Sequence, residues 1–345
     1  MLRVVATASC AVATLLSAQE RPAGTVAFRS EFVFERAPFA SAHASTIAAT
    51  PTALVVAWFA GTRESAPDVG IWVARREKNG WTAPVEVANG VQENSARFPC
   101  WNPVLFQPRG APLMLFYKVG PNPREWWGMV RTSADDGRTW SAPRRLPDGI
   151  IGPVKNKPVQ LATGDIVSPS STESPDLTVN AWRVHFELSS DTGRTWRRVA
   201  PESPSIDAIQ PSVLAHADGR LEAVGRTCNT RLFETWSTDG GHSWTPLTLG
   251  ALPNPNAGTD AVTLRDGRFL VVYNASTSER TPLVVALSRD GIAWRTIATL
   301  ESSPGEYSYP SVIQDAAGTV HITYTWQRAR IRHIELDESA LGTLP

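Results

Sequence analysis

The chain has few cysteines and no region dominated by charge of one sign. Three cysteines in 345 residues are too few for a disulfide framework. The 33 basic residues balance the 33 acidic ones, and no segment gathers one sign as a nucleic-acid groove or a polybasic membrane patch would. We therefore expect no nucleic-acid partner and no membrane insertion, and the sequence indicates no obligate protein partner.

The sequence also lacks the usual signatures of metal and cofactor sites. Its six histidines are scattered, and it contains neither an HExxH motif nor paired CxxC spacings. A glycine-rich phosphate loop and a Gly-x-Ser-x-Gly nucleophile elbow are absent as well. These absences predict chemistry without a metal or a cofactor.

The first twenty residues predict export. In MLRVVATASCAVATLLSAQE, Arg3 precedes a short run of small and apolar residues, the pattern of a signal peptide over residues 1–18, cleaved near Ala18. The run is too short and too rich in small residues to favour a membrane span. We expect a periplasmic or extracellular protein. Its two remaining cysteines, Cys100 and Cys228, form either one disulfide or two buried thiols.

A short polar segment ending in tryptophan recurs along the chain. SADDGRTW at 133–140 returns as SSDTGRTW at 189–196 and STDGGHSW at 237–244, with a shortened copy ending at Trp294 and a degenerate one ending at Trp81. Aspartate and serine side chains bond nearby backbone N–H groups, glycine supplies a positive φ, and tryptophan anchors the turn on a sheet. These boxes predict turns between strands, not catalytic groups.

The spacing of the boxes predicts the architecture. Their tryptophans fall at 81, 140, 196, 244 and 294, so the gaps are 59, 56, 48 and 50 residues, close to the length of a four-stranded propeller blade. Strand-like runs lie between the boxes, and no long helical periodicity competes with them. Together with a last segment near the C-terminus, this predicts an all-β, six-bladed β-propeller as one domain over residues 25–340. A strand near Thr25 to Phe34 should complete the final sheet.

Asp boxes at this spacing resemble those of the sialidase (BNR/Asp-box) superfamily, over nearly the whole mature chain. The resemblance implies a sialidase-like glycoside hydrolase in which three arginines bind the substrate carboxylate, an aspartate is the acid/base, and a glutamate assists a tyrosine nucleophile. A neutral phenol approaches an anomeric centre beside a carboxylate with less charge repulsion than a second carboxylate would, provided that a base takes its proton.

Five positions match the pattern of that family. The segment AWFAGTRESAPDVGIW supplies Arg63 and, as the acid/base, Asp68. GRLEAVGRT and SERTPLVVALSRDG supply the second and third of the three carboxylate-binding arginines, Arg226 and Arg280. GEYSYPSV supplies the nucleophile, Tyr309, with Tyr307 on the same side of an extended strand.

Two positions depart from the pattern. His43 stands where the resemblance implies the first arginine, and histidine lacks the planar fork that grips a carboxylate. Gln210 stands where it implies the glutamate, and an amide is not a base. The carboxylates that we expect to replace this base are Glu173 or Glu306, and His43 is a further candidate because imidazole titrates near neutrality.

Loops between the boxes carry further candidate ligands. Loops at one end of a propeller converge on a single pocket. We expect tryptophans there to stack on sugar rings and cations to contact an acidic group. The tryptophans are Trp101, Trp126 and Trp127, and the cations are Arg124, Lys155 and Lys157.

The leading hypothesis is an exported, sialidase-like exo-glycoside hydrolase acting on an acidic or unusual sugar of a glycan or polysaccharide. His43 and Gln210 count against sialic acid itself as the substrate. A uronate polysaccharide lyase is an alternative, because a tyrosine or histidine that removes a proton beside a neutralised carboxylate would use many of the same residues. A non-catalytic carbohydrate-binding propeller is the third reading.

Overall fold

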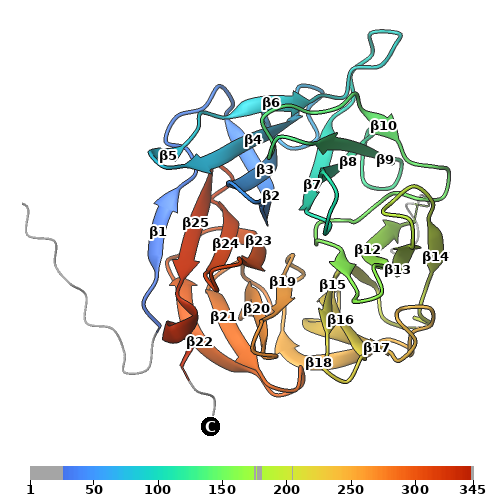
Figure 1. The fold of residues 1–345 in the computed structure, drawn as a ribbon, viewed down its shortest axis with the longest axis vertical. Helices are drawn as coiled ribbons and strands as arrows, with labels where there is room; N and C mark the ends of the chain where they lie inside the picture. Colours follow the sequence, from blue (N-terminus) through green and yellow to red (C-terminus); the bar gives the residue numbers. More distant parts are fainter. Residues whose placement is uncertain (1–25, 175, 177–180, 204, 343–345) are drawn as a thin grey trace, which may run out of the picture.

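Six antiparallel sheets surround a central axis in the computed structural model of the chain (Figure 1). The structure describes residues 26–174, 176, 181–203 and 205–342, so the predicted signal peptide lies outside the described residues. The prediction of an all-β, six-bladed propeller is confirmed. No helix in the described ranges is long and apolar enough to cross a bilayer.

The first three blades follow one another along the chain, each with its first strand nearest the axis. Blade 1 contains β2 (Ser41–Ala49), β3 (Leu54–Gly61), β4 (Gly70–Glu77) and β5 (Gly80–Trp81), and β6 (Val85–Ala88) also pairs with β4. Blade 2 contains β7 (Cys100–Phe106), β8 (Leu113–Val119), β9 (Trp127–Ser133) and β10 (Arg144–Arg145). Blade 3 contains β11 (Val159–Gln160), β12 (Ile166–Glu173), β13 (Trp182–Ser189) and β14 (Arg197–Val199).

The last three blades repeat this order, except that the outermost strand of blade 6 comes from the N-terminal part of the chain. Blade 4 contains β15 (Ala208–Ala215), β16 (Leu221–Thr227), β17 (Arg231–Ser237) and β18 (Thr248–Pro253). Blade 5 contains β19 (Asp260–Thr263), β20 (Phe269–Asn274), β21 (Leu283–Ser288) and β22 (Arg295–Glu301). Blade 6 contains β23 (Tyr307–Gln314), β24 (Val320–Trp326), β25 (Arg330–Leu336) and β1 (Arg29–Phe32), and a short 3-10 helix, Glu338–Leu341, follows β25.

Strand β1 closes the ring. It pairs antiparallel with β25, with Glu31 opposite His333, and lies beside β25 at the left of Figure 1. This confirms the expected N-terminal strand in the final sheet. Because both ends of the described chain contribute to blade 6, the ring cannot open without breaking this pairing.

The repeated boxes form turns, as predicted. In the first box, Asp135 Oδ1 accepts hydrogen bonds of 2.8 Å from both Ser133 Oγ and the Thr139 amide, and the Gly137 amide donates to Ser133 Oγ at 2.8 Å. The same bonds recur around Asp191 and around the aspartate of the third box. Each box follows the third strand of its blade.

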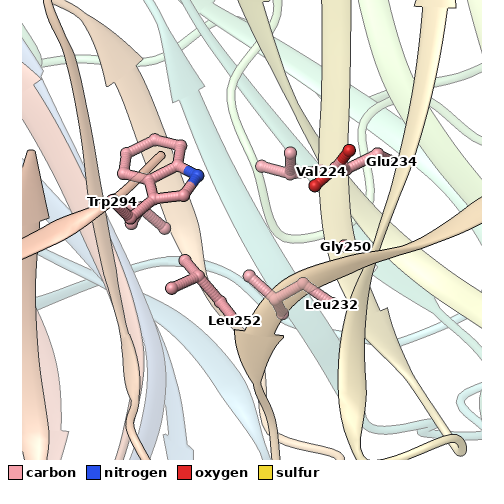
Figure 2. Close-up of a pocket in the computed structure, with 7 residues that line it drawn as sticks. Val224, Leu232, Glu234, Gly250, Leu252 and Trp294 are labelled. Carbon is pink, nitrogen blue, oxygen red and sulfur yellow. The ribbon is translucent and has the colours of Figure 1, made fainter. Parts of the chain in front are cut away.

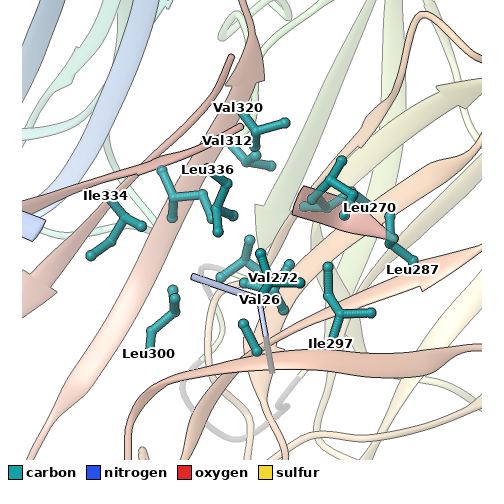
Figure 3. Close-up of a cluster of buried hydrophobic side chains, with 14 of the residues drawn as sticks. Val26, Leu270, Val272, Leu287, Ile297, Leu300, Val312, Val320, Ile334 and Leu336 are labelled. Carbon is teal, nitrogen blue, oxygen red and sulfur yellow. The ribbon is translucent and has the colours of Figure 1, made fainter. Parts of the chain in front are cut away.

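Box tryptophans also pack the seams between blades. Trp244 stacks on Phe186 of the preceding blade, with ring centroids 3.8 Å apart. Figure 2 shows the next seam, where Trp294 faces Leu232 and Leu252. The seam between blades 5 and 6 holds a larger apolar cluster that includes Val26 (Figure 3). The hydrophobic packing therefore lies between neighbouring blades instead of in one central core.

Cys100 and Cys228 form no disulfide with each other, and Cys100 is buried whereas Cys228 is exposed. Neither expectation for them, one disulfide or two buried thiols, therefore holds. Cys100 begins β7 next to the axis, whereas Cys228 lies just after β16, so their strands belong to different blades.

Strand direction decides which residues share an end of the ring. The first strand of each blade starts at the end where the second strand finishes, because neighbouring strands are antiparallel. The loops after β3, β8, β12, β16, β20 and β24 therefore lie at the end where β2, β7, β15 and β23 begin. The Asp boxes lie at the opposite end, so the candidate site must be built at the end away from them.

Candidate active site

Four of the strands nearest the axis share the same irregularity near their starts. Two residues are left unpaired between His43 and Thr46, Trp101 and Val104, Ile209 and Ser212, and Ser308 and Ser311. The first unpaired residue has a positive φ in every case: Ala44 at 52°, Asn102 at 36°, Gln210 at 57° and Tyr309 at 52°. In three strands proline follows, which donates no ladder hydrogen bond. Such bulges re-aim side chains, and here they mark the rim where Gln210 and Tyr309 lie.

Tyr309 is surrounded by groups from four other blades. Arg226 Nη1 donates a hydrogen bond of 2.8 Å to its phenol oxygen. The guanidinium carbon of Arg280 lies 5.8 Å from the centre of the tyrosine ring, and Lys155 Nζ lies 6.0 Å from it. The ring of His43 is 4.3 Å away between centroids. The structure thus brings together five of the residues singled out in the sequence.

His43 is a buried, uncharged neighbour of this tyrosine. Its Nδ1 lies 2.9 Å from Thr325 Oγ1, and that oxygen also accepts the amide hydrogen bond of Ala44 at 3.1 Å. Burial lowers the pKa of His43 well below its usual value, and the charges of Arg328 and Arg280 lower it further. His43, which stands where the resemblance implies an arginine, is therefore uncharged near neutral pH.

Glu306 holds two arginines beside the tyrosine. Its Oε1 pairs with Arg280 Nη1 at 2.6 Å, and its Oε2 pairs with Arg328 Nε at 2.9 Å. Ser308 Oγ also donates to Oε1, at 2.9 Å. Burial raises the pKa of Glu306, but the hydrogen bond from Arg328 and the charge of Arg280 outweigh it, so the pKa is lowered. Glu306 therefore remains a carboxylate that positions cations, and Arg328 itself also pairs with Glu64.

Glu173 differs from Glu306 because it forms no ion pair with any residue that the structure describes. It is the cross-strand neighbour of Trp182, whose ring lies 5.1 Å from the guanidinium carbon of Arg226. Burial raises the pKa of Glu173, and the charges of Arg226 and Arg124 only partly offset this. Of the two carboxylates, Glu173 is the one whose surroundings favour taking up a proton, because its pKa is raised whereas that of Glu306 is lowered.

Three buried polar atoms around this cluster have no hydrogen-bond partner within the described residues: Arg124 Nε, Gln210 Oε1 and Arg226 Nε. Buried polar groups in proteins are nearly always hydrogen-bonded to protein or water. Gln210 Oε1 lies close to Gly258, where an added Cβ would be 3.3 Å from this oxygen and 2.9 Å from Lys155 Cε. The absence of a side chain at Gly258 therefore leaves room for both groups. The unsatisfied atoms mark a place where water or a polar ligand can bind.

The two candidate lysines, Lys155 and Lys157, bind other groups of the protein inside the ring. Lys155 Nζ donates to Asn156 Oδ1 at 2.7 Å, to the Thr259 carbonyl at 2.6 Å and to the Pro310 carbonyl. Lys157 Nζ pairs with the buried Asp260 at 2.9 Å. All three ammonium donors of Lys155 are therefore occupied by protein. Burial lowers the pKa of Lys155 to about 7, yet three acceptors around one nitrogen match its protonated form.

Arg63 and Asp68 lie on the loop after β3, at the same end of the ring as Tyr309. Asp68 Oδ2 accepts bonds from Thr62, 2.8 Å from its amide and 2.5 Å from its Oγ1, and these bonds lower the pKa of Asp68. A hollow of about 350 Å³ beside it is lined by Phe39, Thr62, Trp72, Glu86 and Arg97. Within the described residues, no hydrogen bond, ion pair or ring contact joins Arg63 or Asp68 to Tyr309.

The three candidate tryptophans lie in different surroundings. Trp127 packs edge-on against Phe98, with ring centroids 5.7 Å apart, and Arg145 covers it at 5.2 Å. Trp101 is buried and donates to the Gly120 carbonyl at 2.8 Å. Trp126, half-buried on the loop after β8, is the best placed of the three to meet a sugar ring.

Comparison with known proteins agrees with this architecture. Residues 52–322 match the BNR repeat-like domain, which is more than half of the chain. The chain belongs to the BNR repeat-like domain family. The chain is also 26% identical over 216 residues to a sialidase of Micromonospora viridifaciens. That alignment covers 56% of this chain and 33% of the sialidase. The chain thus matches only about a third of the length of this curated relative.

Solved structures resemble this BNR repeat-like domain in fold. The intramolecular trans-sialidase from Ruminococcus gnavus, solved in complex with oseltamivir carboxylate, gives a TM-score of 0.72 at 13% identity over 92% of this chain and 99% of that one. A protein of unknown function from Dyadobacter fermentans gives 0.71 at 17% identity, over 89% and 97% of the two chains. At identities this low, these structures establish the sialidase-like propeller fold but no substrate.

Three residues of the site in this BNR repeat-like domain escaped the sequence analysis: Trp182, Thr325 and Arg328. Of these, Arg328 had a signal. It comes two residues after the second strand of blade 6, as Arg63 does in blade 1. Trp182 lies opposite Glu173 in the pairing of β12 with β13. Reading the loop after each second strand, blade by blade, would have found Arg328.

Proposed function

We propose that this chain is an exported exo-glycoside hydrolase that removes an acidic or otherwise unusual sugar from a glycan or polysaccharide. The observation that carries the proposal is the hydrogen bond from Arg226 to the phenol oxygen of Tyr309, within a group of cations at one end of the propeller. A cationic donor aimed at that oxygen stabilises the negative charge that grows there as the phenol loses its proton.

The proposed chemistry uses a covalent intermediate. Tyr309 attacks the anomeric carbon while Glu173 accepts the phenol proton, directly or through one water. The glycosidic bond breaks as Asp68 protonates the leaving oxygen, and water then hydrolyses the bond between the sugar and Tyr309 by the reverse proton transfers. The bonds from Thr62 favour the ionised form of Asp68, so the acid role of Asp68 is the part of the scheme that most needs a test.

The surrounding charge favours an anionic substrate. Arg226, Arg280 and Arg328 lie near Tyr309 or pair with its neighbour Glu306, and the neutral His43 adds no negative charge. Guanidinium groups bind carboxylates through paired hydrogen bonds. In this proposal Arg328 supplies part of the positive charge that His43 lacks. Sialic acid and uronic acids are the sugars to test first.

The test compares Tyr309→Phe with Tyr307→Phe on fluorogenic glycosides of sialic, glucuronic and galacturonic acid. Tyr309→Phe should lower kcat/KM by at least about 10³-fold, because the phenol oxygen is the attacking atom. Tyr307→Phe is the matched control, since its hydroxyl only accepts a bond of 3.3 Å from Gln327, and we expect a change of less than about threefold. Full activity in Tyr309→Phe would rule out the proposed nucleophile.

A carbohydrate-binding propeller without catalysis is the second candidate, favoured by Gln210 and by the Thr62 bonds that hold Asp68 ionised. Asp68→Asn separates the two functions, because it should abolish turnover in an enzyme and spare glycan retention in a binding protein. If no glycoside is hydrolysed, ultraviolet absorbance on a panel of uronate polymers tests for a lyase, whose product carries a new C=C bond beside the carboxylate.

A further inference from the structure

The seam between blades 6 and 1 contains two buried imidazoles at the place where the seam between blades 3 and 4 holds stacked aromatic rings. In blade 3, Phe186 on the third strand stacks against the box tryptophan of the next blade. The corresponding contact here joins His333 on β25 to Trp81, with ring centroids 5.2 Å apart. A second buried imidazole, His321 on β24, lies parallel to His333 at 5.3 Å. Two imidazoles buried together need polar partners on every ring nitrogen.

Carboxylates occupy the outward nitrogen of each ring. His321 Nε2 lies 3.2 Å from Asp315 Oδ2, and His333 Nδ1 lies 3.2 Å from Glu31 Oε1. A carboxylate only accepts hydrogen bonds, so each of these nitrogens carries the proton of its ring. Glu31 is held in place by Arg76 at 2.7 Å and by the indole of Trp81 at 2.9 Å, so it remains an acceptor toward His333.

The two inward nitrogens then carry lone pairs that face each other. His321 Nδ1 and His333 Nε2 are 3.1 Å apart, and two neutral acceptors at that distance repel unless a cation lies between them. The carboxylate of Glu335 completes the group, because ligand atoms of all three residues lie within 4.8 Å of one another. In the sheet register Glu335 lies directly opposite His321 and two residues from His333 on the same strand.

We propose that His321 Nδ1, His333 Nε2 and the Glu335 carboxylate form a binding site for a divalent transition metal of the zinc type. Zinc takes imidazole nitrogens at about 2.0–2.1 Å, so two of them in a tetrahedral site lie about 3.3 Å apart, close to the 3.1 Å seen here. Ligand histidines commonly donate their other N–H to a carboxylate, which is the role of Asp315 and Glu31.

The surroundings leave room for a fourth ligand. A hollow of about 250 Å³ opens beside His333 and Glu335, where a water molecule can reach the metal. Arg29 and Arg76 line the same hollow. Arg76 is already paired with Glu31. Arg29 is the cross-strand neighbour of Glu335 on β1, so of these two arginines Arg29 opposes cation binding more directly.

The position of this group suggests what the metal does. Its ligands lie on β24 and β25, and Glu31, which orients His333, lies on β1, the strand that closes the ring (Figure 1). A bound metal would tie the closing strand to blade 6 and, through Trp81, to blade 1. The ligands are remote from the strand starts near Tyr309, so the metal is structural and independent of the proposed hydrolysis.

The sequence predicts no metal site here, because the three ligands do not lie at the short, local spacing of a metal-binding motif. His321, His333 and Glu335 come from two neighbouring strands, and only their register brings them together. The expectation of chemistry without a metal concerns Tyr309 and is not affected by a structural site at the other end of the blade.

The experiment uses the untagged full protein, stripped with a chelator and then titrated with Zn²⁺ and Co²⁺. We expect one equivalent of metal per chain by elemental analysis, a rise in Tm on adding Zn²⁺, and visible absorption bands from Co²⁺ in a low-symmetry nitrogen and oxygen site. Glu335→Gln should weaken Zn²⁺ binding by at least about tenfold. Because Glu335 is only half-buried, this variant should fold, whereas His333→Gln would also remove the ring contact with Trp81 across the seam.

His242→Gln is the matched control, since His242 is exposed on another blade, and it should leave metal uptake and the Zn²⁺-dependent rise in Tm unchanged. A stripped protein that takes up no metal would overturn the proposal and leave a proton shared between His321 and His333. Metal uptake that is equal in the original protein and in Glu335→Gln would also overturn it, because the metal would then lie elsewhere.

Discussion

Glu222 is a carboxyl group buried against the neighbouring blade. Its Oε2 lies 3.0 Å from His216 Nε2, and the backbone at Gly291 is so close that a Cβ there would lie 1.9 Å from Oε2. Burial raises the pKa of Glu222 to about 9, and the nearby carboxylates of Glu234 and Asp290 add to the rise. At neutral pH this side chain therefore keeps its proton in the folded protein. Figure 2 shows Glu234 in the same seam, between blades 4 and 5.

Glu222→Gln should stabilise the protein increasingly as the pH rises from 5 to 8. The folded state holds the proton of Glu222 in this range while the unfolded state releases it, so the stability of the original protein falls with rising pH. Glutamine is a close mimic of the neutral acid and has no such proton to keep. The difference in free energy of unfolding between the two proteins should grow by up to about 1 kcal/mol per pH unit, measured by urea unfolding at each pH.

Glu93→Gln serves as the control because Glu93 is exposed, and its effect on the free energy of unfolding should stay nearly constant from pH 5 to 8. A difference for Glu222→Gln that is equally flat would mean that Glu222 is ionised in the folded protein, and that burial does not decide its charge.

Single residues were predictable from the sequence only where a motif fixed them. Arg226, Arg280 and Tyr309 stand in recognisable segments, and the structure brings all three together. The choice between Glu173 and Glu306 depends on which carboxylate meets an arginine across a blade, and this is a tertiary contact that no local pattern contains. The bonds that occupy Lys155 cross three blades and were equally out of reach of the sequence.

At the scale of the element, the Asp box ties each blade to the one before it. Gly241 in the third box has φ of +90°, and a Cβ added there would lie 3.2 Å from Leu188 and 3.3 Å from Val167 of blade 3. The box thus needs glycine twice, once for its backbone conformation and once because the neighbouring blade approaches so closely. The sequence predicted the first reason from turn chemistry, but not the second.

Gly241→Ala should therefore destabilise the protein more than Gly164→Ala. Gly164 lies in a turn at a similar φ of +97°, with no atom within 4 Å of an added Cβ. An alanine at Gly164 pays only the conformational cost of about 1–2 kcal/mol, whereas one at Gly241 also crowds blade 3, for about 1–3 kcal/mol more. Urea unfolding of both variants measures the difference, and equal losses of stability would show that the seam relaxes without cost.

At the scale of the molecule, the six-bladed ring followed from the repeat because one structural unit recurs at near-constant spacing, and the closing strand followed from the need to cover an edge. What the sequence did not predict is how the blades are joined at the axis. Asp260 of blade 5 accepts a bond of 2.9 Å from Ser212 of blade 4 and one of 2.8 Å from the Val312 amide of blade 6. It also pairs with Lys157, next to blade 3.

Breaking this axial ion pair should cost far more than breaking one at the surface. Asp260→Asn leaves the ammonium of Lys157 without its carboxylate and should lower the free energy of unfolding by about 3–5 kcal/mol. The same substitution in a Lys157→Met background should cost less, since no buried cation is then left without its carboxylate, and the two changes should couple by at least about 1 kcal/mol.

The surface pair Arg183–Asp207, at a similar 2.8 Å, is the matched control and should couple by less than about 1 kcal/mol. Additive effects of the two substitutions at the axis would contradict the idea that Asp260 joins four blades through its charge, because its hydrogen bonds to Ser212 and Val312 would then suffice.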